Sequence, residues 1–120
     1  VILPVSAPFH CALMQPAQDR LAEVLRGLDF ADARVPVVVN VEAAARTSAE
    51  ALREALIRQV TGPVRWVESM RLMAGEGPAQ FIEVGPGKVL CGLMRQIDRA
   101  QTCTHMDDVL RDESTFLRAQ

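Results

Sequence analysis

The chain has 120 residues, of which 49% are hydrophobic and 23% are charged, and its formal net charge is −2. This composition is typical of a folded globular protein and excludes a wholly disordered chain, and the length suits one small domain. The longest apolar runs have the length of strands, far short of the ~20 residues that a helix needs to cross a bilayer. The lack of a basic excess argues against a nucleic-acid-binding protein.

Three cysteines, Cys11, Cys91 and Cys103, form an odd set without a CxxC spacing or a cluster of His and Cys. We therefore expect reduced thiols in the cytoplasm, with no disulfide framework and no metal site. The chain starts at Val1 with an apolar run and no Met. We interpret it as a fragment of a longer protein.

The first part of the chain predicts a strand, a helix and a second strand. The apolar run Ile2–Ser6 predicts a strand that Pro8 ends. Apolar residues recur over 13–28 at helical spacing, and we expect Gly27 to end that helix. The run Val35–Val41 is nearly all β-branched, which predicts a strand buried on both faces of a parallel sheet.

Two helices are expected next. Thr47 and Glu50 have the spacing of a capping box that opens a helix over residues 48–60. Pro63 ends that helix and can occupy the first turn of another, over residues 64–74.

The last part of the chain predicts a strand, a glycine-rich turn and a helix. The strand covers residues 80–84, the turn 85–87 and the helix 88–97. A short strand over 102–105 and a closing helix over 107–118 complete the pattern. The alternation of helices and strands indicates an α/β fold.

His10 is the strongest candidate for chemistry. It follows a predicted strand end and Pro8, where α/β enzymes place functional side chains. The structural alternative is a histidine that packs at a helix start. Cys11 is adjacent, but neighbouring side chains at a helix start rarely face each other, so we expect a core cysteine rather than a Cys–His pair.

The segment Gly85–Lys88 is only superficially similar to a phosphate-binding loop, because it lacks the full GxxxxGK[ST] spacing. We interpret it as a tight turn, with Lys88 a weak hint of an anion site. No serine lies in a GxSxG motif, so any nucleophile that His10 activates lies outside the chain. We interpret two of the four serines as helix-cap or helix-surface residues, Ser48 and Ser69, and the others are Ser6 and Ser114.

Four blocks of the sequence together resemble a known family. Val5–Met14 is similar to the catalytic-histidine segment of malonyl-CoA:acyl carrier protein transacylases. Pro36–Val41, Ile57–Trp66 and Phe81–Leu90 follow in the order and spacing of that family. The resemblance covers roughly residues 1–98, and residues 99–120 are similar to its variable tail.

This resemblance implies an acyltransferase fold, a hydrolase-like and mostly parallel sheet with flanking helices. Residues 1–120 would be the C-terminal fragment of that domain. The nucleophilic serine, the oxyanion hole, the carboxylate-binding arginine and a small ferredoxin-like subdomain would all lie upstream, outside this chain. The family transfers malonyl from coenzyme A to the phosphopantetheine thiol of acyl carrier protein in fatty acid biosynthesis, through an acyl-serine intermediate. The fragment alone is expected to be inactive.

The resemblance also implies roles for individual residues. His10 matches the histidine that acts as general base and acid. Gln59 matches the residue whose backbone carbonyl orients that imidazole. Phe9 matches a position associated with malonyl over methylmalonyl substrates, and plain packing is the alternative. The implied partners are malonyl-CoA, acyl carrier protein and the rest of the acyltransferase chain, without nucleic acid, membrane, metal or a cofactor beyond the coenzyme A thioester.

Two other functions stay open from the sequence. The chain could be a non-catalytic remnant that binds an acidic carrier protein through basic residues, with a solvated charged surface as the plainer interpretation. Those residues are Arg58, Arg65, Lys88 and Arg95. It could also be part of an acyltransferase domain of a polyketide synthase.

Overall fold

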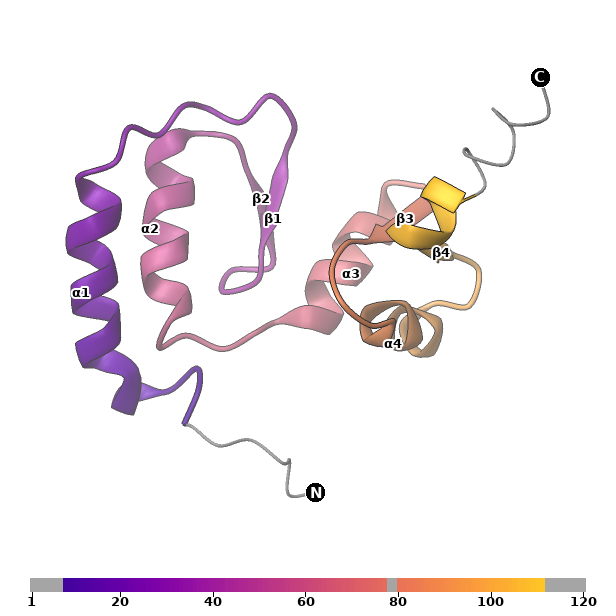
Figure 1. Ribbon diagram of the computed structural model, residues 1–120, viewed down its shortest axis with the longest axis horizontal. Coiled ribbons are helices and arrows are strands. Elements are labelled where there is room, and N and C mark those ends of the chain that lie inside the picture. The colour runs from indigo at the N-terminus through magenta and orange to yellow at the C-terminus, as the bar shows by residue number, and fades with distance from the viewer. Residues whose placement is uncertain (1–7, 78–79, 112–120) are drawn as a thin grey trace. The chain divides into compact units, whose positions relative to one another are not determined.

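The computed structural model describes residues 8–77 and 80–111 (Figure 1). The chain forms two compact units, Val1–Ser69 and Met70–Gln120. Helix α3, Trp66–Gly75, spans the boundary between them. The predicted strand Ile2–Ser6 and the end of the predicted last helix lie outside the described residues.

Two helices lie side by side in the first unit (Figure 1). A short 3-10 helix, η1 (Ala12–Met14), leads into α1 (Gln15–Arg26), which ends before Gly27 as predicted. Helix α2 (Ala49–Gln59) packs against α1. The side chains of both helices that are buried are small or aliphatic: Ala22, Ala55 and Ile57. This packing brings the end of α2 and the segment before α1 into one unit.

Helix α2 begins one residue later than the predicted capping box. Ser48, and not Thr47, is the N-cap, and its Oγ accepts the Ala51 N–H at 3.2 Å. Asp32 Oδ1 accepts the Ala49 N–H at 2.8 Å, which satisfies a second free donor of the first turn.

The prediction of a doubly buried parallel strand over Val35–Val41 is wrong. Strand β1 covers only Val37–Val39 and pairs antiparallel with β2 (Ala44–Arg46). Val37 is 42% exposed. The chain reverses immediately after β1, because the Ala43 N–H donates to the Val39 carbonyl at 2.8 Å and Ala43 takes a left-handed φ of 51°.

The second unit has the predicted strand–turn–helix–strand order. Strand β3 (Gln80–Glu83) leads into α4 (Val89–Ile97), and β4 (Thr102–His105) pairs parallel with β3. A helical turn follows over residues 106–111. The parallel pair joined through a helix agrees with the α/β fold that the sequence predicts.

The prediction of three reduced thiols is wrong for two cysteines. Cys91 and Cys103 form a disulfide, and Cys11 is free. Cys91 lies in α4, which packs on β4, and the two Cα atoms are 5.3 Å apart, within the range that a disulfide spans. The pair is created by this packing, so no spacing rule in the sequence indicates it.

Candidate functional site

His10 has an unusual backbone conformation. Its φ is 56°, in the left-handed region that few residues other than glycine adopt. Such conformations cost free energy and cluster at functional sites. The side chain of His10 is exposed. The neighbouring Cys11 is half-buried, not fully buried as expected, and its thiol donates to the Pro8 carbonyl at 3.0 Å rather than to the imidazole.

The imidazole of His10 contacts a backbone carbonyl distant in sequence. His10 Nδ1 lies 3.0 Å from the Gln59 oxygen, across 49 positions of the chain. A carbonyl oxygen only accepts, so Nδ1 carries the proton of this hydrogen bond. In the neutral ring Nε2 then holds the free lone pair and can accept a proton. The structure therefore brings together the two residues that the sequence singles out.

The side chain of Gln59 points to a different place from its carbonyl. Gln59 is the last residue of α2, where carbonyls lack partners within the helix. Its amide Nε2 donates to the carbonyls of Gly62 at 3.3 Å and Pro63 at 3.2 Å. The contact with His10 thus involves only the backbone of residue 59.

Two basic residues of the first unit, both considered above for carrier binding, are already paired. Arg58 forms an ion pair and a hydrogen bond with Glu42. This hydrogen bond is the largest cause of the lowered pKa of Glu42. Arg65 makes two hydrogen bonds to Glu68, both 2.8 Å, and these raise the pKa of Arg65. Phe9, next to His10 in the chain, is 57% exposed.

In the second unit, the start of α4 is occupied by a side chain of the protein itself. Glu83 accepts the N–H groups of Leu90 at 3.0 Å and Cys91 at 2.9 Å. The Cys91 N–H is the largest cause of the lowered pKa of Glu83. Because a carboxylate already takes the position that a phosphate would bind, the geometry agrees with a tight turn and not with a phosphate site. Gly85 and Gly87 supply the positive φ values of this turn, 131° and 85°.

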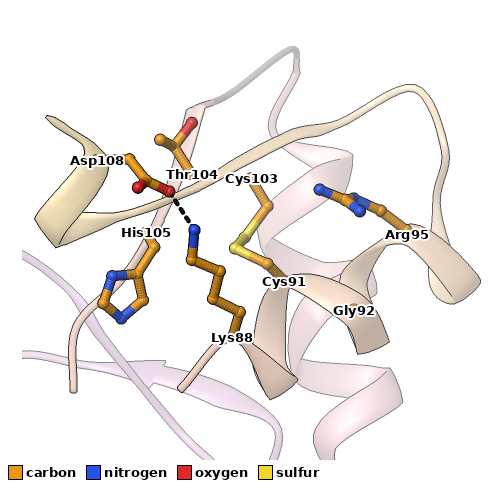
Figure 2. A pocket seen from close by; sticks show the side chains of 8 residues that line it. All are labelled: Lys88, Cys91, Gly92, Arg95, Cys103, Thr104, His105 and Asp108. Atoms are coloured by element: carbon orange, nitrogen blue, oxygen red, sulfur yellow. Dashed lines mark hydrogen bonds and ion pairs between the residues drawn. A yellow bond between two sulfur atoms is a disulfide. The ribbon is translucent and has the colours of Figure 1, made fainter. Parts of the chain in front are cut away.

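Lys88 does not offer a free charge either. Its Nζ lies 2.6 Å from Asp108 Oδ2, at a pocket of about 340 Å³ (Figure 2). This contact is the largest cause of the lowered pKa of Asp108. Arg95, at the same pocket, has no partner among the residues that the structure describes. Of the four basic residues considered for carrier binding, three are therefore neutralised by acidic neighbours.

His105 is a buried polar residue that the sequence did not single out. It is 5% exposed, its Nε2 lies 2.6 Å from the Gly85 carbonyl, and its Nδ1 accepts the Asp107 N–H at 3.2 Å. It holds the turn after β3 in place. The sequence offers little signal for it, because it is simply the last residue of a predicted strand.

The described serines have structural roles. Ser48 is the N-cap of α2, which agrees with the expected helix-cap or helix-surface role. Ser69 is 1% exposed, and its Oγ donates to the Arg65 carbonyl at 2.8 Å, so the prediction of a cap or surface position is wrong for it. Ser6 and Ser114 lie outside the described residues. Over the described ranges there is no helix long and apolar enough to cross a membrane.

Known proteins with similar sequence and structure point to one family, although no family model matches the chain. The chain is 46% identical over 106 residues to the malonyl CoA-acyl carrier protein transacylase of Escherichia coli K12. The match covers 88% of this chain and 34% of the relative, so the chain spans about a third of the length of the curated relatives. These comparisons confirm the resemblance expected from the sequence.

Solved structures agree in fold. The malonyl CoA-acyl carrier protein transacylase of Clostridium perfringens matches 99% of this chain and 38% of its own, with a TM-score of 0.85 and 33% identity. A malonyl-transacylase solved in complex with its type II polyketide synthase acyl-carrier protein matches 87% of this chain and 34% of its own, with a TM-score of 0.80 and 46% identity. The acyltransferase fold predicted from the sequence is therefore confirmed.

Proposed function

We propose that this chain supplies the general base, His10, and its orienting carbonyl, Gln59, to a malonyl-CoA:acyl carrier protein S-malonyltransferase. The single observation that carries the proposal is the 3.0 Å contact between His10 Nδ1 and the Gln59 carbonyl. A carbonyl in this position does what an aspartate does in other hydrolase-like sites: it fixes the tautomer and the orientation of the imidazole. The similarity to malonyltransferases adds the substrate class.

The chemistry that follows is acyl transfer between two thiols. His10 Nε2 takes the proton of a serine hydroxyl as the serine oxygen attacks the malonyl thioester carbonyl. The tetrahedral intermediate collapses by breaking the carbon–sulfur bond, and the imidazolium returns its proton to the coenzyme A sulfur. In the second half, the same nitrogen takes the proton of the phosphopantetheine thiol, which attacks the acyl-serine, and returns it to the serine oxygen.

The serine, the oxyanion hole and the carboxylate-binding arginine come, in this proposal, from the remainder of the acyltransferase. We assign residues 1–98 to the C-terminal part of that domain that matches the family and residues 99–120 to its variable tail. The first unit exposes large apolar side chains: Phe9 is 57%, Val24 60% and Leu13 75% exposed. Their exposure supports the proposal that the remainder of the acyltransferase packs against this unit. Phe9 would fill the space that an α-methyl group of the substrate needs.

The proposed setting is the cytoplasm, with malonyl-CoA and acyl carrier protein as partners and fatty acid biosynthesis as the pathway. It rests on the similarity to the bacterial transacylases, because the disulfide between Cys91 and Cys103 removes the argument from reduced thiols. The carrier bound by one structural relative belongs to a type II polyketide synthase, which keeps polyketide synthesis as a second candidate setting. A purely carrier-binding remnant is less well supported, because Arg58, Arg65 and Lys88 are paired with acidic side chains.

The test is a chimera in which this chain replaces the matching third of the Escherichia coli relative. The chimera is expected to load malonyl on its serine and to transfer it to acyl carrier protein, and His10→Ala is expected to abolish transfer. Gln96→Ala, an exposed change in α4, is the matched control and should keep full activity. A properly folded chimera that transfers malonyl equally well with Ala at position 10 would overturn the proposal. The chain alone is expected to show no transfer.

A further inference from the structure

The end of α2 leaves the Gln59 carbonyl without the backbone donor that the helix would normally supply. The Gly62 N–H donates to the Arg58 carbonyl at 2.9 Å, which continues the helical i to i−4 pattern. The next donor in that pattern, for the Gln59 carbonyl, is residue 63. Residue 63 is proline, which has no N–H. The Gln59 oxygen is therefore left to the imidazole of His10, 3.0 Å away.

The side chain of Gln59 also stabilises the turn that follows α2. Its amide donates to the carbonyls of Gly62 and Pro63, at 3.3 and 3.2 Å. The residue that presents the carbonyl thus also fastens the segment that follows it. Gly62 leaves no room for a side chain, since a Cβ would lie 2.6 Å from Val41 Cγ2 and 2.7 Å from the Arg58 oxygen.

A third contact joins this turn to the helix that follows His10. Thr61 Oγ1 donates to Gln18 Oε1 of α1 at 2.6 Å. Helix α1 follows η1 directly, and η1 begins two residues after His10. The imidazole and its acceptor are therefore anchored to the same pair of packed helices.

We propose that Pro63 and the side-chain amide of Gln59 are positioning residues for the base. Pro63 keeps the Gln59 carbonyl free of a backbone donor, and the amide keeps the turn closed so that the carbonyl faces His10 Nδ1. This inference rests on the proposed function of His10. Any residue at position 59 could supply the backbone carbonyl. The proposed role of the side-chain amide requires a glutamine there.

The first test is Pro63→Ala, which gives residue 63 an N–H that competes for the Gln59 oxygen. Long-range ¹H–¹⁵N spectra of the chain report which imidazole nitrogen of His10 carries the proton. We expect Pro63→Ala to lower the share of the Nδ1–H form. In the chimera we expect it to lower kcat about fivefold, the effect of one weakened hydrogen bond, with KM unchanged. Pro36→Ala, an exposed proline before β1, is the control and should change neither reading.

A second variant guards against a Pro63→Ala chain that does not fold. Gln59→Glu keeps the size of the side chain but replaces its N–H donors with an oxygen that faces two carbonyls. We expect the same loss of the Nδ1–H form. A folded Gln59→Glu or Pro63→Ala chain with the wild-type tautomer would overturn the proposal. The spectra need no activity: an inactive wild-type chimera would refute the proposed function, whereas the tautomers would still decide the positioning roles.

Discussion

The strongest prediction concerns the unequal weight of His10 and Gln59 in transfer. In the chimera, His10→Ala removes the base, and a positioned general base contributes about 10²–10⁴-fold to rate. Gln59→Ala keeps the backbone carbonyl itself but removes the two side-chain hydrogen bonds that hold its turn closed, at 3.2 and 3.3 Å, near the long end of the normal range. Each contributes about 1 kcal/mol. If both bonds were lost entirely from the transition state, the rate would fall about thirtyfold.

The assay is the initial rate of malonyl transfer to acyl carrier protein for the wild-type chimera, both single variants and the double variant. We expect at least a hundredfold loss for His10→Ala and less than about thirtyfold for Gln59→Ala. The double variant should match His10→Ala, because residue 59 acts only through the imidazole. The reasoning is refuted if Gln59→Ala is as damaging as His10→Ala, or if the two losses multiply in the double variant.

Three further predictions concern the stability of the chain. Ser48→Ala should lower the free energy of unfolding by about 1 kcal/mol in urea titration, because it removes the N-cap of α2, and an unchanged midpoint would contradict the capping role. Reduction of the disulfide between Cys91 and Cys103, 12 positions apart, should lower the free energy of unfolding of the second unit by about 3 kcal/mol. Cys11→Ser is the control, and a titration that finds three free thiols before reductant is added would contradict this prediction. The Glu83 pKa is lowered in the folded state, so its contribution is complete above the ordinary glutamate pKa and is lost as the pH falls through the lowered value. Urea midpoints from pH 7 to pH 3 should therefore fall for the wild type and fall less for Glu83→Gln, with the exposed Glu76→Gln as control.

The elements whose cause is local were predictable from the sequence. The end of α1 at Gly27, the strand–turn–helix around Glu83 and the strand Thr102–His105 follow from glycine, proline and apolar spacing. The pairing of His10 with the carbonyl of Gln59 was expected only from the family resemblance. Position alone favoured a histidine that packs at the helix start, and the resemblance reversed that interpretation.

The predictions that failed concern backbone turns and side-chain contacts that residue spacing does not reveal. The hairpin of β1 and β2 turns through Ala43, which has a left-handed conformation. A glycine at this position would have indicated a turn, but an alanine does not. The disulfide requires α4 to pack on β4, and the buried hydroxyl of Ser69 donates to the Arg65 carbonyl one helical turn earlier. Lys88 looked like a free cation because its partner, Asp108, lies 20 positions away. Local propensity carries none of this information.

The central claim is that the Gln59 carbonyl sets the tautomer of His10. The most direct measurement is the long-range ¹H–¹⁵N spectrum of His10 in the wild-type chain at a pH where the imidazole is neutral. The structure predicts a protonated Nδ1 and a free Nε2, the nitrogen that would take the proton of the nucleophile. A proton on Nε2, or a ring that samples both forms as free histidine does, would contradict it.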